Sequence, residues 1–471
     1  MNERIVSAVV RSRARSASLV GLAVLGGAWS LACGATDGGT SSGAASHDTA
    51  VSHTASASTE RARVAQYLDS IYRLEDVRHT FRTAGGENVD CIDFDAQPSV
   101  QRARAQGIPV SNEPPPIALP RGAVTNAQPL SGADQTADEQ GRTRLCPAGT
   151  VAFSGRPTYE QIEAKGGLDE YVRSIAIHKR GAAPAVQPDS IPAHTQPGPD
   201  WDHAAGFQFV NYTYFSTTTP VFTPMLENSG DHSVSQMWVL TGSCASDSFV
   251  GSCGTSACAP YTCSNANTQV QSLEVGWIVG SPNSDANPHL FVFTTTDGYG
   301  SSSCFAQSGC GSFVRMSAPY WPGAPLTSTN LGSTPVELTM AVVNYNQTWY
   351  IVADGSYIGY IPPNTYRGQM QSSASYFQVG GEVFDSWENN PPSHTITFMG
   401  SGISDWGYPA IAYHRNVQFV APGGSGWTNA ALTFQNGNGI TGNNAATYYH
   451  VVHGNPGGAN WGSFFYFGGP F

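Results

Sequence analysis

The stretch that decides the fold is residues 271–279, which reads Gln-Ser-Leu-Glu-Val-Gly-Trp-Ile-Val. Its aliphatic residues and its tryptophan are typical of a β-strand that packs on a core. Successive side chains of a strand point to opposite faces, so Leu273, Val275 and Trp277 share one face. Glu274 lies on the other face, where a carboxylate is costly to bury unless it is paired or protonated.

A second stretch of the same character is residues 376–384, Tyr-Phe-Gln-Val-Gly-Gly-Glu-Val-Phe. Here Glu382 follows two glycines and precedes two apolar residues. Residues 201–471 contain only five glutamates, so two of them in apolar, strand-like settings stand out. We predict that Glu274 and Glu382 form a pair for acid–base chemistry.

From about Trp201 onwards, short strand-like segments alternate with Gly, Asn, Pro and Ser. This spacing, without a long helical pattern, predicts an antiparallel sandwich of two β-sheets. The expected fold class is therefore mainly β, with a small α+β domain before the sandwich. The predicted strands are residues 207–215, 234–240, 273–279, 290–295, 338–345, 348–352, 376–379, 395–399, 411–420, 448–452 and 464–467.

The charge of the chain is unevenly distributed. A chain of 471 residues is long enough for two or three domains, and only 12% of its residues are charged. Residues 201–471 hold three basic residues and no lysine, against thirteen acidic residues. An acidic, lysine-free domain argues against nucleic-acid binding. Few salt bridges and few carboxylates also suit a protein that works in acid, because less of its stability is lost on protonation.

Residues 1–33 have the pattern of a secretory signal peptide, in which arginines precede an apolar run at residues 17–32. The end of the run, Trp-Ser-Leu-Ala-Cys-Gly, resembles a bacterial lipobox and makes Cys33 the acylated first residue of a lipoprotein. Simple secretion is the alternative. In both cases we expect an exported protein, in the bacterial cell envelope or outside the cell. Residues 34–58 are rich in Gly, Ser, Thr and Ala and are predicted to be a disordered linker.

Three segments follow this linker. Residues 59–180 are predicted to be a small mixed domain, with a helical period from Thr59 to about Phe81 and a short strand in residues 89–98. A second helical pattern, in residues 158–177, is interrupted by two glycines. Residues 181–200 carry five prolines and few apolar side chains, which marks an exposed linker before the sandwich of residues 201–471.

Cysteine counting agrees with export. Without Cys33 the chain has eight cysteines, an even number that favours disulfides in an oxidising compartment. Cys304 and Cys310 bracket a short loop and are expected to pair, and Cys91 with Cys146 would close the N-terminal domain. The other four cysteines lie close together in one segment and could form either two disulfides or a zinc site: Cys244, Cys253, Cys258 and Cys263.

Several motifs occur in a characteristic order. Residues 89–98 and Cys146-Pro-Ala-Gly-Thr150 stand in the first domain. The second domain carries Ser233-Val-Ser-Gln-Met-Trp238, Glu274-Val-Gly-Trp277, the Cys304–Cys310 loop, Gly359-Tyr-Ile-Pro362, Gly380-Gly-Glu-Val383, Met399-Gly-Ser-Gly402 and residues 461–470. As an ordered set, these motifs resemble those of the neprosin family, glutamic peptidases that cleave after proline and carry an N-terminal activation domain.

The resemblance implies that Glu274 and Glu382 are the catalytic residues and that no metal or cofactor takes part. It implies a zymogen, in which residues 59–180 are a propeptide that covers the groove and the linker at residues 181–200 is cut. The expected partners are protein or peptide substrates rich in proline and the propeptide itself, with a membrane reached only through a lipid anchor. Ile361 and Val379 stand where the family often has tryptophan, and residues 244–263 resemble an insertion. These departures bear on substrate preference more than on catalysis.

The chemistry also follows from the residues. Peptide hydrolysis without a metal or a nucleophile needs a base to activate water and an acid to protonate the leaving nitrogen. Two nearby carboxyls do not both ionise readily, so one keeps a proton in mild acid and the pair titrates as a unit. Either glutamate fits either role. Four residues are candidates to line the groove, although such residues are more often part of a core: Gln236, Trp238, Trp277 and Tyr345.

Two other functions stay open on the residues alone. A carbohydrate-active or carbohydrate-binding sandwich would use the same glutamates together with exposed aromatic residues. A metal pair is suggested by His450 and His453, but a spacing of three puts them on opposite faces of a strand. Asp297, which precedes a glycine, indicates a turn.

Overall fold

The computed structural model describes residues 48–117, 128–129, 144–175, 200–241, 270–280, 286–297, 299, 302–386, 395–403, 407–436, 449–457 and 461–470. Cys33, the four crowded cysteines at residues 244–263 and almost all of the proline-rich linker lie outside these residues. The structure comprises two compact units, Met1–Ala55 and Ser56–Phe471, and the sections below concern the second. Within the described part of the chain, no helix is long and apolar enough to cross a membrane.

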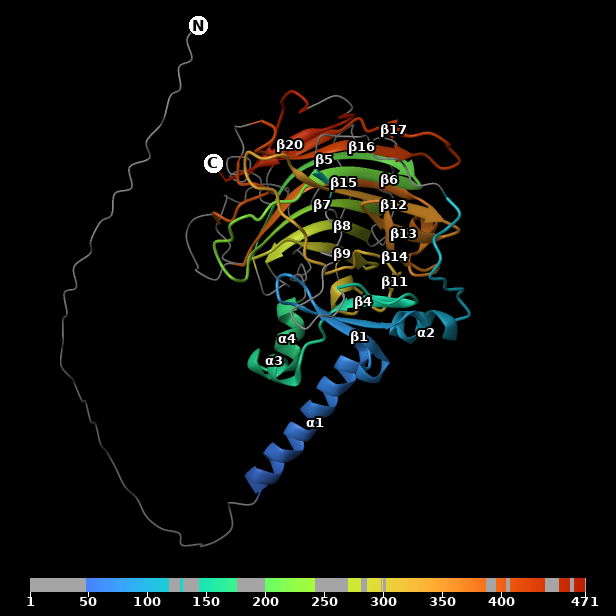
Figure 1. The fold of residues 1–471 in the computed structure, drawn as a ribbon, viewed down its shortest axis with the longest axis vertical. Helices are drawn as coiled ribbons and strands as arrows, with labels where there is room; N and C mark the ends of the chain where they lie inside the picture. Colours follow the sequence, from blue (N-terminus) through green and yellow to red (C-terminus); the bar gives the residue numbers. More distant parts are fainter. Residues whose placement is uncertain are drawn as a thin grey trace, which may run out of the picture. The chain divides into compact units, whose positions relative to one another are not determined.

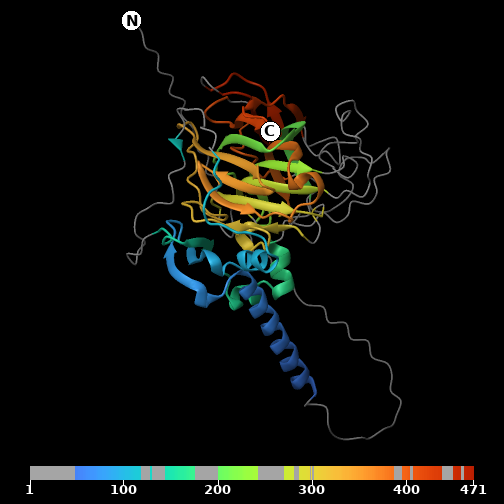
Figure 2. The ribbon, with the colours of Figure 1, turned by 90° about the vertical axis from the view of Figure 1, so that its right-hand side faces the viewer.

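Two β-sheets stack face to face in the second unit (Figure 1, Figure 2). The first sheet has the strand order β10 (Cys304–Phe305), β9 (His289–Thr295), β8 (Gln271–Gly280), β7 (His232–Thr241), β15 (Ala374–Asp385), β5 (Asp200–Tyr212) and β18 (Thr433–Asn436). The second has the order β11 (Val314–Arg315), β14 (Ser356–Ile361), β13 (Thr348–Ala353), β12 (Val336–Tyr345), β6 (Tyr214–Pro220), β16 (Ala412–Val420), β20 (Phe465–Gly468) and β19 (His450–Val452). Two short strands join its sides, β17 (Thr428–Asn429) beside β16 and β3 (Gln128–Pro129) beside β12.

The hydrophobic core lies between the two sheets. Leu273, Val275 and Trp277 of β8 are fully buried in one cluster with Leu338 and Met340 of β12. Burying an aliphatic or aromatic side chain of this size contributes about 1.5–3 kcal/mol, so the alternation of β8 fixes which of its faces meets the second sheet. The mainly β fold class with its two packed, antiparallel sheets is confirmed.

Polar contacts also join the two sheets. The Trp277 indole donates to the carbonyl of Pro220 at 2.9 Å. The His414 imidazole lies between the hydroxyls of Thr217, at 3.0 Å, and Ser235, at 3.2 Å. Burial lowers the pKa of His414 to about 3, so this ring stays neutral in mild acid and accepts one hydrogen bond while donating the other.

One predicted strand is a loop. Residues 395–399 are extended but make only an isolated bridge, between Met399 and Gly469. Their hydroxyls serve another purpose, because Thr395 and Thr397 both donate to the buried carboxylate of Asp231. The β-branched composition of the segment indicated a strand, but hydrogen bonds to a side chain took the place of pairing with a neighbouring strand.

The N-terminal part of the second unit forms a small α+β module. Its elements are α1 (Asp48–Ile71), η1 (Leu74–Asp76), β1 (Val77–Arg82), β2 (Asn88–Asp93), η2 (Phe94–Ala96), α2 (Pro98–Ala105), β4 (Thr150–Ser154), α3 (Tyr159–Ala164) and α4 (Leu168–Ile175). The two-glycine break divides α3 from α4 as expected. The helix expected to reach about Phe81 ends at Ile71, because Val77–Arg82 forms a strand that pairs antiparallel with β2 and buries Phe81.

Two predicted disulfides are present. Cys91 of β2 pairs with Cys146, and Cys304 pairs with Cys310. The first links β2 to the segment before β4, and the second closes the loop that contains η5 (Ala306–Ser308). These pairings confirm that part of the cysteine prediction.

The α+β module shares its core with the sandwich. Phe94, Val100 and Phe153 of the module form one buried cluster with Val314 and Met316 of the sandwich. Figure 1 shows the strands of the module beside β11. This interface is mainly apolar, so the module docks as a packed layer and not as a loosely tethered domain.

Arg315 is the polar centre of this interface. Its side chain is 2% exposed, and its guanidinium lies 4.0 Å from the centre of the Phe153 ring. It donates to three carbonyls, those of Ala152, Pro322 and Ala306. The side-chain amide of Gln97 donates to the backbone carbonyl of Arg315 and accepts the backbone N–H of Arg315. Burial lowers the pKa of Arg315 to about 9, which still leaves the guanidinium charged in acid.

We expect Arg315→Ala to lower the free energy of unfolding by about 2–4 kcal/mol, because it creates a cavity and removes one donor from each of three buried carbonyls. The loss is measured by guanidinium unfolding. The control is Arg367→Ala, since Arg367 is exposed and forms its hydrogen bonds with Gln271 through the backbone. Equal stability of the Arg315 variant and the wild type would contradict this account of the interface.

Candidate active site

The two predicted glutamates lie on the same face of the first sheet. Glu274 of β8 is opposite Trp238 of β7, and Glu382 of β15 is opposite Val234 of the same strand. Strand β7 therefore separates the two glutamates, which also stand four residues apart along the strand direction. Gln236 occupies the middle of this diagonal, one step of about 7–8 Å from each glutamate position.

This face is turned away from the second sheet. The alternate residues of β8 enter the core, so Glu274 projects from the opposite side of the strand. Both glutamates are nevertheless buried, with 3% of Glu274 and 6% of Glu382 exposed. Two carboxylates with so little contact with water need partners on this face.

Glu274 has two hydroxyl partners on one of its oxygens. The Tyr299 hydroxyl donates to Oε1 at 2.7 Å, and the Ser272 hydroxyl donates to the same oxygen at 3.0 Å. Both partners are neutral hydroxyls, which bond a carboxyl group whether it is ionised or protonated. The arrangement can therefore hold a protonated Glu274 in one defined orientation.

Tyr299 reaches Glu274 from a strained turn. Its φ of 64° lies in the left-handed region, which is rare for a bulky residue and costs of order 1–3 kcal/mol. Its backbone N–H donates to the Thr295 hydroxyl at 3.0 Å, and Asp297 accepts the backbone N–H of Ser302 at 2.9 Å. Asp297 is thus a turn residue, as predicted, and the turn aims the phenol at the carboxylate.

Glu382 is flanked by two histidines. The His203 Nε2 lies 2.9 Å from Glu382 Oε2, within a hydrogen bond. The His232 Nε2 lies 3.6 Å from Oε1, too far for a hydrogen bond, so its effect is electrostatic when the ring is charged. Burial alone would raise the pKa of Glu382, but His203 and His232 outweigh it and hold that pKa well below its ordinary value.

The other predicted site residues divide between the two faces of the fold. Gln236 and Trp238 lie on the face of the glutamates. Trp277 lies on the opposite face with 0% of its surface exposed, so it is a core residue and does not line a groove. Tyr345 ends β12 in the second sheet and is likewise removed from this site.

Four residues of this face were not predicted: His203, His232, Tyr299 and Gln378. The histidines precede Glu382 by more than a hundred residues, and only strand register brings them to it. A possible signal was the placement of His203 and His232 in strand-like segments with apolar neighbours, where a polar residue requires a partner.

No metal cluster is present among the residues that the structure describes, in the sense that no three His, Cys, Asp or Glu side chains are placed to hold one ion. The absence of a metal from the reaction stays a prediction. His450 and His453 are not brought together as ligands, since His453 packs against Phe434 at the edge of the fold.

Comparison with known proteins gives one family and several solved structures. Residues 254–470 match the Neprosin family model, a range that contains both glutamates and a little under half of the chain. Scytalido-glutamic peptidase with a peptide-based transition-state analogue is 8% identical, with a TM-score of 0.29, and the match covers 57% of this chain and 98% of that one. SCP-B, an Eqolisin-family peptidase with the tripeptide Ala-Ile-His, is 7% identical, with a TM-score of 0.30 and the same coverages.

A third solved structure is the PL7 alginate lyase AlyA1 from Zobellia galactanivorans. It is 12% identical, with a TM-score of 0.21, and the match covers 38% of this chain and 62% of that one. Structural likeness at these TM-scores carries no functional argument.

We expect His203→Asn to destabilise the protein most near pH 6. Ionised Glu382 with a depressed pKa adds stability above the ordinary carboxyl value of 4.5, and this stability is lost as the pH falls through the folded-state pKa. Without His203, burial raises that pKa. The unfolding free energy should therefore fall by about 2 kcal/mol at pH 6, and the difference from wild type should shrink toward pH 2.5.

Guanidinium unfolding at pH 6, 4 and 2.5 measures this difference. The control is His453→Asn, because His453 is an exposed histidine outside the site. A difference between His203→Asn and wild type that stays constant across the three pH values would contradict the pairing of His203 with an ionised Glu382.

Proposed function

We propose that this chain, which carries a Neprosin domain at residues 254–470, is a glutamic endopeptidase that works in acid. The observation that carries the proposal is the environment of Glu274 and Glu382, which both fall within that range and are buried on one face of a sheet. Glu382 is kept ionised by histidines, whereas Glu274 is held by hydroxyls that tolerate a proton. One carboxyl suited to each protonation state is what acid–base hydrolysis requires.

We assign Glu382 as the general base. Its depressed pKa keeps it ionised at pH values where an ordinary carboxyl group is protonated, so it can take a proton from water in acid. The water oxygen then attacks the carbonyl carbon of the scissile peptide bond, and a tetrahedral intermediate forms. His203 and His232, when protonated, balance the charge of the base before this step.

We assign Glu274 as the general acid. The proton of the Glu274 carboxyl group passes to the nitrogen of the leaving group, and the C–N bond breaks to give a carboxylic acid and an amine. Glu382 then carries the proton that came from water and Glu274 is ionised, so solvent must return a proton to Glu274 and remove one from Glu382. Activity should be confined to acid, because Glu274 can donate only while it is protonated.

The preference for proline is the finer part of the proposal. Trp238 and Tyr376 form a buried cluster with Phe207 and Phe209 next to Glu274 in the strand register. Flat aromatic faces suit the rigid, apolar pyrrolidine ring of a proline before the scissile bond. The aromatic cluster therefore supports cleavage after proline.

We expect Glu274→Gln and Glu382→Gln each to lower the rate of peptide cleavage at least about a hundredfold, because each removes a proton-transfer group. Cleavage of a proline-containing peptide at about pH 3 is measured by mass spectrometry, with circular dichroism to check the fold. Glu227→Gln is the control, since exposed Glu227 only accepts the backbone N–H of Ile396.

A variant of either glutamate that keeps more than about a tenth of the wild-type rate would remove that residue from the acid–base step. The same incubation with a polysaccharide tests the alternative class. Cleavage of the polysaccharide but not of the peptide would replace the peptidase proposal by a carbohydrate-active one.

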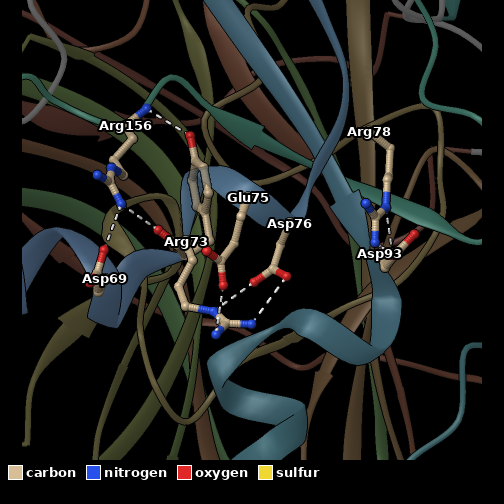
Figure 3. Close-up of polar contacts among 8 residues, drawn as sticks. Asp69, Arg73, Glu75, Asp76, Arg78, Asp93 and Arg156 are labelled. Atoms are coloured by element: carbon tan, nitrogen blue, oxygen red, sulfur yellow. Dashed lines mark hydrogen bonds and ion pairs between the residues drawn. The ribbon is translucent and has the colours of Figure 1, made fainter.

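We further propose that the protein is exported, either lipidated at Cys33 or freely secreted, and that it is made as a zymogen. The ion pairs of the α+β module support an acid trigger (Figure 3). They include Arg78 with Asp93 and Arg156 with Asp69. Such exposed pairs contribute about 0–1 kcal/mol each, so protonation of several carboxylates weakens the module from within.

The interface with the sandwich responds differently to acid. Most of its contacts are apolar packing and hydrogen bonds of neutral groups or of Arg315, which do not titrate in acid; one ionisable pair, His289 with Glu87 at 3.6 Å, also crosses it. Asp93 and Asp95 pair with Arg78 and Arg104 of the same module rather than with the sandwich. Acid would thus loosen the module while the interface persists, so a cut in the linker is needed to release it.

We expect incubation at about pH 3 to produce a cut between residues 181 and 201, because acid activates the site and the linker supplies prolines after which it cuts. Intact-mass measurement gives the position of the cut, and Glu274→Gln protein is the control for self-processing. An uncut chain with full activity would show that the module inhibits nothing.

A further inference from the structure

Two glutamine side chains between the glutamates are buried without complete hydrogen bonding. Gln236 and Gln378 are each 1% exposed. Gln236 Oε1 has no hydrogen-bond partner, and neither has Gln378 Nε2. A buried polar group without a partner costs about 1–3 kcal/mol, so two on one face of one sheet call for a functional reason.

Gln236 lies on the diagonal that joins the two glutamates, and Gln378 lies beside it on the same face of the sheet. Gln236 lies opposite Gly276 and Gly380, and Gln378 lies opposite Trp238, in the row of Glu274. A Cβ at Gly276 would meet Gln236 Cβ at 2.6 Å, and a Cβ at Gly380 would meet the Ala204 carbonyl at 2.2 Å. The two glycines therefore leave Gln236 as the one side chain in the middle of the diagonal.

The two open atoms are complementary. The Tyr376 hydroxyl donates to Gln378 Oε1 at 3.0 Å, which leaves Nε2 as an oriented donor. Gln236 Oε1 is an open acceptor. The two do not bond to each other, so a group that offers one acceptor and one donor can be bound by both. A secondary amide is such a group.

We propose that Gln236 and Gln378 bind the scissile peptide group of the substrate. The carbonyl oxygen accepts from Gln378 Nε2, and the N–H donates to Gln236 Oε1. The inference rests on the proposed peptidase function, since a peptide attacked between Glu274 and Glu382 must pass over the middle of their diagonal. As the carbonyl becomes tetrahedral, negative charge develops on its oxygen and the bond from Gln378 strengthens.

The assignment predicts which bonds are cut. The bond after a proline is a secondary amide whose N–H belongs to the next residue, so it satisfies both glutamines. A bond whose following residue is itself proline has no N–H and leaves Gln236 Oε1 unpaired. A site that binds an N–H discriminates against a substrate that lacks one.

The test compares a peptide with the matching ester, in which oxygen replaces the scissile N–H. Gln236→Met should lower kcat/KM for the peptide about tenfold or more and leave the ester nearly unchanged, because only the peptide offers the N–H. Gln378→Met should lower kcat/KM for both substrates, because both have the carbonyl. The difference in intrinsic reactivity between the peptide and the ester does not affect the test, because each variant is compared with wild type on the same substrate.

Thermal unfolding separates binding from a structural role. Gln236→Met keeps the shape and removes an unpaired amide, so its Tm should equal or exceed that of wild type. Gln378→Met is combined with Tyr376→Phe, because the Tyr376 hydroxyl would otherwise lose its acceptor. The control is Gln369→Met, since Gln369 is exposed and outside the site.

A lower Tm with equal losses on peptide and ester for Gln236→Met would overturn the proposal. Wild-type kcat/KM for the peptide in both glutamine variants would also overturn it, provided that Glu274→Gln and Glu382→Gln abolish cleavage. Cleavage that survives both glutamate substitutions would instead refute the proposed function itself.

Discussion

The structure depends on keeping two carboxylates buried on one face of a sheet whose other face forms the core. Strict alternation along β8 and β15 makes this possible, because Trp277 and Val383 enter the core while Glu274 and Glu382 do not. A buried carboxylate without partners would unfold the sheet or take up a proton. The histidines at Glu382 and the hydroxyls at Glu274 solve this problem in two chemically different ways.

The same solution suits the two groups to the different roles that we propose for them. Histidines stabilise the charged form of Glu382, and their effect exceeds that of burial. Hydroxyls can bond a neutral or a charged carboxyl group, so Glu274 is free to change its protonation state. The left-handed backbone of Tyr299 shows that the chain accepts local strain to bring one of these hydroxyls into place. A pair of similar residues thus becomes an unequal pair through its surroundings.

We could predict from the sequence the strand around Glu274, the core face of that strand and two disulfides. Each of these depends on local alternation or on counting cysteines. The partners of the two glutamates could not be predicted in this way. His203 meets Glu382 only through the pairing of β5 with β15, and pairing between distant strands is not encoded in any short segment. The prediction for Trp277 was wrong for a different reason. Trp277 was assigned to the groove because it is aromatic and close in sequence to Glu274, although the alternation of side chains along the strand puts it on the core face.

Acid acts on the second unit at three levels that differ in their chemistry. The ion pairs of the α+β module lose charge, the two sheets keep a His414 that burial already holds neutral, and Arg315 stays charged against carbonyls that do not titrate. Contacts that do not titrate in acid are therefore found between the two sheets and around Arg315, whereas the ionised Glu382 makes a contribution to stability that acid removes. In our proposal, lower pH acts on the ion pairs of the module that is to be removed. This difference follows from where ionisable pairs occur: on the surface of the module, and rarely in a sandwich with only three basic residues from residue 201 onwards.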